Sequence, residues 1–116
     1  MLRIVITVNH QEFIAVIEHP QLIPYFQTQL PMAMMMTELN GNEKYVQLEL
    51  PFTLASERFA EIQPGDLMIY NNTYFVIFYE PVRNHYTYTK IGSLENPAGL
   101  KQALGNGDVQ FHLRIE

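Results

Sequence analysis

The chain has 116 residues, of which 47% are hydrophobic and 16% are charged, so it is long enough for one sizeable core and too short for two ordinary domains. Its formal charge is −5 and its basic residues are scattered, which argues against a nucleic-acid surface because such a surface needs clustered cations. The absence of cysteine excludes a disulfide scaffold, a thiolate metal site and a cysteine nucleophile.

The beginning of the chain alternates polar and apolar residues and does not resemble a signal peptide. No apolar run reaches the ~20 residues that a membrane span requires. We therefore expect a cytoplasmic protein without membrane association, built as a single domain over residues 1–116.

The first two predicted strands form a hairpin. Apolar residues alternate with others over residues 2–8, which predicts a strand with one buried face. Asn9-His10 is a typical two-residue turn, and residues 11–17 predict the second strand, with apolar side chains on both faces. Such strands occur in covered or closed sheets.

Residues 20–30 change to the spacing of a short amphipathic helix. Pro24 has no backbone N–H, so the helix either begins at Pro24 or bends there after one turn. Pro31 ends the helical stretch.

A methionine-rich strand over residues 32–39 follows, and Asn40-Gly41 after it is the strongest short hairpin signal in a sequence. Residues 45–50 are the predicted return strand. The methionines can either fill the core or line an adaptable ligand pocket, and we favour the core. Residues 40–45 can either bind a ligand or only form the turn, and we favour the turn, with Glu43 and Lys44 as solvated charges.

Residues 62–79 predict a buried hairpin in the middle of the chain. Pro64-Gly65 favours a tight turn, and we interpret Asp66 as the cap of that turn rather than as a base. Asn71-Asn72-Thr73 connects the strands at 67–70 and 74–79, because asparagine tolerates positive φ.

The remaining elements are short. Residues 51–60 and 80–85 predict loops, residues 86–91 a strand that Gly92 ends or bends, residues 97–104 a brief helix, and residues 109–115 a strand. Eight short strands and two short helices without a βαβ rhythm predict a mainly β fold, a closed antiparallel barrel with the helices at its ends. Closure also removes exposed strand edges.

Several segments resemble, in order and over nearly the whole chain, the small bacterial cyclophilin-like proteins. They are Glu-Leu-Asn-Gly-Asn-Glu-Lys-Tyr at 38–45, Pro-Gly-Asp-Leu-Met-Ile-Tyr at 64–70, Phe-Tyr at 78–79, Tyr-Thr-Tyr-Thr-Lys-Ile-Gly at 86–92 and Asn-Pro-Ala-Gly-Leu at 96–100. The resemblance implies a closed eight-stranded barrel of cyclophilin type.

The resemblance also raises prolyl isomerisation, which true cyclophilins catalyse with an arginine in a Phe-His-Arg motif. That motif is missing here, because residues 4–57 contain no arginine, and the chain has no tryptophan for the pocket rim. We therefore predict a non-catalytic binding or accessory module without a cofactor, which takes a peptide segment or a small ligand. The alternative is a divergent peptidyl-prolyl isomerase in which Lys44, Tyr45 or Arg83 replaces the lost arginine.

Aromatic residues on neighbouring predicted strands form the candidate groove, although such pairs also stabilise a sheet without any ligand. The groove residues are Tyr45, Tyr70, Phe78, Tyr79, Tyr86 and Tyr88.

The histidines at 10, 19, 85 and 112 do not have the spacing of metal ligands, so we expect no metal site. The resemblance further suggests a flavodoxin-like redox protein as a partner.

Overall fold

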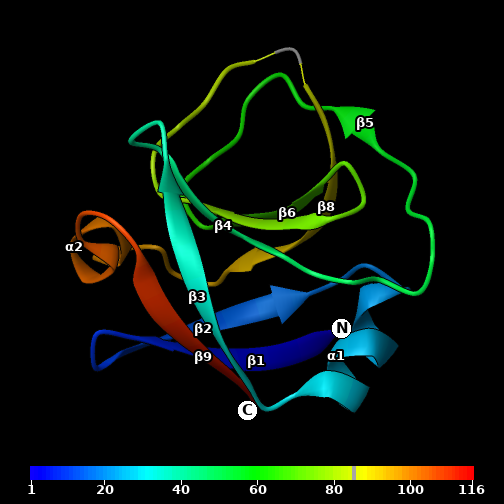
Figure 1. The fold of residues 1–116 in the computed structure, drawn as a ribbon, viewed down its shortest axis with the longest axis horizontal. Helices are drawn as coiled ribbons and strands as arrows, with labels where there is room; N and C mark the ends of the chain where they lie inside the picture. The colour runs from blue at the N-terminus through cyan, green and yellow to red at the C-terminus, as the bar shows by residue number, and fades with distance from the viewer. Residues whose placement is uncertain (85) are drawn as a thin grey trace.

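The computed structural model describes residues 1–84 and 86–116, and these form the predicted closed eight-stranded antiparallel barrel (Figure 1). The barrel strands are β1 (Leu2–Val8), β2 (Gln11–Ile17), β3 (Met32–Leu39), β4 (Glu43–Gln47), β6 (Asp66–Tyr70), β7 (Tyr74–Phe78), β8 (Thr87–Leu94) and β9 (Val109–Ile115). They follow the order β2-β1-β9-β3-β4-β7-β6-β8, and a further pairing of β2 with β8 closes the ring. A two-residue strand, β5 (Glu57–Arg58), pairs with β8 outside this ring.

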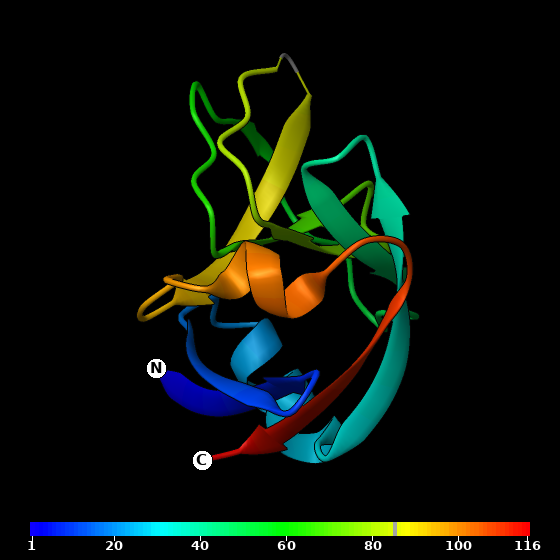
Figure 2. The same ribbon diagram turned by 90° about the vertical axis from the view of Figure 1, so that its left-hand side faces the viewer.

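The main core lies inside the barrel, because alternate residues of each strand point inward. Leu22 and Phe26 of α1 (Leu22–Gln29) and Leu100 and Leu104 of α2 (Leu100–Leu104) join this core. The two helices approach it from opposite sides (Figure 1), and Figure 2 shows α2 lying across one of them. The helices therefore complete a core that the strands alone would leave open at the ends.

Helix α1 begins at Leu22, two residues before Pro24, and runs without interruption to Gln29. Of the two alternatives for Pro24, a helix start at this residue is therefore wrong. The first four N–H groups of a helix have no partner within the helix, so a proline at the third position removes no hydrogen bond. The Pro24 carbonyl accepts a hydrogen bond of 3.0 Å from the Thr28 hydroxyl.

All three predicted hairpin turns are present. The loop between β1 and β2 has two residues, whereas the loops at 40–42 and 71–73 have three each. The first two residues of each loop have positive φ, which short hairpin loops often require. The φ values are 47° and 64° at Asn9 and His10, 58° and 68° at Asn40 and Gly41, and 52° and 57° at Asn71 and Asn72. Asp66 caps its own turn as predicted, since its carboxylate accepts a hydrogen bond of 2.9 Å from the Gln63 N–H.

The two predicted loops are more ordered than expected. The first contains β5, and the second pairs with the chain before β6, because Ile62 and Val82 exchange two backbone hydrogen bonds of 2.9 Å each. His85 lies outside the described residues. Gly92 does not end its strand, since β8 continues to Leu94 and Gly92 pairs with both Leu67 and Ile17.

A second buried cluster covers the outer face of β4, β7, β6 and β8. Its members are Ile62, Met68, Val76, Phe78 and Tyr88. The β3–β4 hairpin and the chain that leads into β8 rise on the same side of the barrel (Figure 1, Figure 2). Within the described residues, no helix is long and apolar enough to cross a membrane.

Candidate functional site

A pocket of about 350 Å³ lies on this outer face, between the β3–β4 hairpin and the beginning of β8. We call it the tyrosine pocket, because five of its residues are tyrosines. It is lined by Tyr45, Tyr70, Tyr74, Tyr86 and Tyr88, together with Leu39, Asn40, Glu43 and Val76.

Strand alternation explains why these side chains meet. Glu43 and Tyr45 of β4 line the pocket, whereas Lys44 between them is fully buried. On β7, Tyr74 and Val76 line the pocket, whereas Phe75 belongs to the core inside the barrel. The period of two therefore gives this part of the barrel wall an inner apolar face and an outer tyrosine face.

The tyrosine rings pack against one another in two groups. Tyr45 and Tyr74 lie edge to face, with ring centroids 5.8 Å apart. Tyr70 packs against Tyr86 at 5.9 Å and against Tyr88 at 5.4 Å. Contacts of this geometry are favourable for aromatic pairs and restrict the rings to defined orientations.

Of the lining residues that the structure describes, Glu43 alone is acidic or basic, and its residue exposure is only 9%. In register it lies opposite Phe78 on β7 and Leu39 on β3. No described residue donates a hydrogen bond to its carboxylate or forms an ion pair with it. Burial, assisted by the negative charge of Glu38, raises the pKa of Glu43 to about 7. The prediction of a solvated charge is wrong here.

The raised pKa gives the stability of the protein a pH dependence. Between the ordinary value of 4.5 and the folded value of about 7, the folded state keeps a proton that the unfolded chain has lost, so Glu43 costs stability as the pH rises through this window. Glu43→Gln should therefore raise the free energy of unfolding by about 1 kcal/mol at about pH 8 and have little effect at about pH 4. Urea denaturation of both proteins at the two pH values measures the difference in the free energy of unfolding.

The matched control is Glu49→Gln, which changes an exposed carboxylate just after the same strand. That variant should leave stability unchanged at both pH values. An equal effect of Glu43→Gln at both values would show that the folded protein does not keep the Glu43 carboxyl protonated.

Lys44 is also not solvated, because its side chain is fully buried and its ammonium has a complete set of acceptors. It donates to the Gly105 carbonyl at 3.0 Å and to the Gly107 carbonyl, and it lies 3.0 Å from Glu38 Oε1. A lysine has three N–H donors, so all of them are used.

Glu38 connects this network to Tyr79. It accepts hydrogen bonds from the Tyr79 hydroxyl at 2.7 Å and from the Gly41 N–H at 2.8 Å. Burial alone would raise the pKa of Glu38, but the hydrogen bonds from Tyr79, Lys44 and Gly41 outweigh burial and lower it. Burial and the bond to Glu38 raise the pKa of Tyr79 above its ordinary range. The network therefore joins β3, β4 and β7 to the segment after α2.

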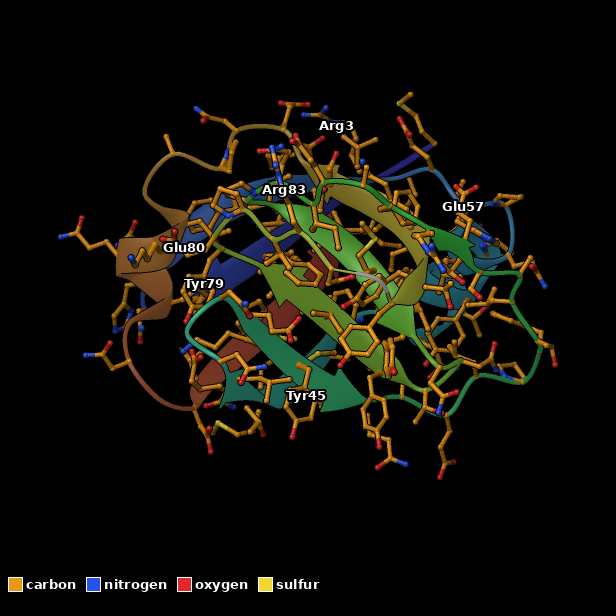
Figure 3. The ribbon with its side chains drawn as sticks, turned by 90° about the horizontal axis from the view of Figure 1, so that it is seen from above. Arg3, Tyr45, Glu57, Tyr79, Glu80 and Arg83 are labelled. Carbon is orange, nitrogen blue, oxygen red and sulfur yellow. The ribbon has the colours of Figure 1, made fainter. Side chains whose placement is uncertain are left out.

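The structure brings four of the six predicted groove residues together, namely Tyr45, Tyr70, Tyr86 and Tyr88. Phe78 lies beneath them, 1% exposed, with its ring against Tyr88 at 5.7 Å. Tyr79 belongs to the core inside the barrel and does not line the pocket. Figure 3 shows Tyr79 on the side of α2, away from Tyr45.

The predicted groove lacks five lining residues: Leu39, Asn40, Glu43, Tyr74 and Val76. Asn40 and Glu43 belong to segment 40–45, whose binding role is the less favoured alternative. The period of two could have found three of the five, because Glu43 shares a strand face with Tyr45, and Tyr74 and Val76 share one with Phe78. Leu39 and Asn40 line the pocket because the β3–β4 hairpin lies near the beginning of β8. No local sequence pattern predicts that arrangement.

Neither basic residue of the isomerase alternative reaches the tyrosine pocket. The Lys44 ammonium is held by the network described above, and the Arg83 side chain is 82% exposed and paired with Glu61 at 2.6 Å. Figure 3 shows Arg83 and Tyr45 on opposite sides of the view. Within the described part of the chain, no group of three or more metal-ligating side chains could hold a metal ion.

Comparison with known proteins gives a family and a fold. The model of the cyclophilin-like family matches residues 6–116. The solution structure of the hypothetical protein AF2241 from Archaeoglobus fulgidus is similar with a TM-score of 0.73, over 99% of this chain and 95% of that chain. Its sequence identity is 15%, so this likeness shows the fold alone. No curated protein matches the chain.

Proposed function

The chain belongs to the cyclophilin-like family, and we propose that it is a binding module that takes a peptide segment or a small molecule into the tyrosine pocket. One observation carries this proposal: five tyrosines converge on one concave site together with a carboxylate that has no partner among the described residues. Ligand sites are typically concave and mostly apolar, with a few well-placed polar groups.

Methyl NMR tests this function. The protein is titrated with a fragment set that contains cationic, anionic and neutral members, and the methyl signals of Leu39 and Val76 report on the pocket. We expect at least one fragment to shift both signals while the core methyls of Leu22 and Leu104 stay in place. The proposal fails if no fragment moves the pocket signals, or if the core signals move equally.

The isomerase alternative requires a cation at the tyrosine pocket, and the described lining residues do not supply one. Rotation about a prolyl bond has a barrier of ~18–20 kcal/mol, and cyclophilins lower it with an arginine beside an aromatic pocket. The described lining of the tyrosine pocket contains no arginine or lysine. The described lining therefore supplies the aromatic part of such a site without the cation.

We expect a protease-coupled proline isomerisation assay to run at the uncatalysed rate with this protein. One result would support the isomerase alternative, namely an isomerisation rate above background that disappears in Tyr88→Ala. This substitution removes a ring from the pocket. Tyr25→Ala, which removes a tyrosine far from the pocket, is the control for a general loss of folding. A flavodoxin-like redox partner and a cytoplasmic location stay predictions from the sequence.

A further inference from the structure

The charges around the tyrosine pocket are unbalanced. Glu43 supplies a carboxylate, and none of the described lining residues is basic. The neighbouring Lys44 points to the other face of the sheet, where three acceptors hold its ammonium. No described basic side chain therefore compensates the Glu43 charge within the protein.

A carboxylate at 9% exposure is costly without a partner, and a ligand cation would provide one. The second nearby carboxylate, Glu38, faces its own donors and adds to the negative potential at Glu43. The whole chain is also acidic, with a formal charge of −5, which favours the approach of cations.

The tyrosine walls suit the same ligand. Aromatic rings attract cations through the negative potential of their faces, and cages of several aromatic rings recognise alkylated ammonium groups. Two groups of rings, Tyr45 with Tyr74 and Tyr70 with Tyr86 and Tyr88, line this one pocket. An alkylated ammonium is weakly hydrated, so it loses less hydration free energy on entering an apolar site than an inorganic cation does.

We propose that the tyrosine pocket binds an alkylated ammonium group, with the Glu43 carboxylate as its counter-ion. This inference rests on the proposed binding function and names the chemistry of the ligand. Tyr86 at the rim is 60% exposed, so the pocket is open on that side. The ammonium can therefore belong to a free small molecule or to a methylated lysine on a protein.

Calorimetry with matched probes tests the cation. Choline carries the ammonium, dimethylbutanol is its neutral isostere, and a short peptide with trimethyl-lysine represents a protein ligand. At about pH 8 we expect choline or the peptide to bind at least about tenfold more tightly than the isostere. Tighter binding of the peptide indicates a protein source of the ammonium, and tighter binding of choline indicates a free molecule.

Variants connect the result to the pocket. Glu43→Gln should weaken binding of the ammonium probe at least about tenfold and leave the isostere unchanged, whereas Glu49→Gln should change neither. Tyr74→Leu keeps the site apolar but removes an aromatic ring, so it should weaken binding of the ammonium probe several-fold. Binding should also weaken from about pH 8 to about pH 5 as Glu43 gains its proton. Among the residues that the structure describes, the titratable groups that act on Glu43 or are acted on by it are Glu38 on β3, Tyr79 after β7 and Tyr88 on β8.

Equal affinity for choline and its isostere, or an ammonium affinity that Glu43→Gln does not change, overturns this inference. The inference also fails if neither ammonium probe binds. If neutral or anionic fragments still shift the Leu39 and Val76 signals in that case, the binding function stands and only the cation is wrong. If nothing shifts them, both proposals fail.

Discussion

Lys44→Met should lower the free energy of unfolding by about 3 kcal/mol. The substitution keeps most of the apolar stem and removes the ammonium. Two backbone carbonyls then lose their lysine donor, and Glu38 loses its cation while it keeps the hydrogen bonds from Tyr79 and Gly41. Urea denaturation, compared with the unchanged protein, measures the loss.

The control for this prediction is Lys101→Met. Lys101 also forms an ion pair, with Glu80 at 2.8 Å, but its side chain is 66% exposed. An exposed pair is worth about 0 to 1 kcal/mol, so this variant should stay close to the unchanged protein. If the free energy of unfolding falls by the same small amount in both variants, the buried Lys44 ammonium does not stabilise this end of the barrel.

Gly92→Ala should cost about 3 kcal/mol or more, because a Cβ at this position would lie 2.2 Å from the Val16 carbonyl oxygen. Gly92 lies opposite Ile17, in the pairing of β8 with β2 that closes the barrel. Backbone cannot move aside as a flexible side chain can, so the two strands would have to separate locally. Thermal unfolding measures the loss.

Ser93→Ala is the control one position further along β8, where the new side chain is smaller than the old one. It should change stability by less than about 0.5 kcal/mol. A similarly small change for Gly92→Ala would mean that β2 and β8 do not approach each other as closely as the structure shows.

The fold was predictable because local signals agree with one another. Alternation identified the strands at 2–8, 86–91 and 109–115, and the turn signals at 9–10, 40–41 and 71–73 indicated the hairpins that contain most of the others. The cyclophilin-like resemblance pointed to the same closed barrel. The short β5 was not predictable, because two residues are too few to show a period.

The candidate site was predictable only in part. Phe78 and Tyr79 are adjacent, so alternation places their side chains on opposite faces, and both could not line one groove. The burial of Lys44 depends on carbonyls 61 and 63 residues further along the chain, which no local pattern reveals. Glu43 looked like a turn charge because its partners across the sheet, Leu39 and Phe78, are known only from the register.

Tyrosine ring NMR during a choline titration tests most directly whether the tyrosine pocket is a cation site. The chain has seven tyrosines, of which five line the pocket, and Tyr25 and Tyr79 serve as internal controls outside it. We expect the ring signals of the five to shift with one common affinity, and those of Tyr25 and Tyr79 to stay in place. Shifts spread evenly over all seven, or none at all, would contradict a cation site between these rings.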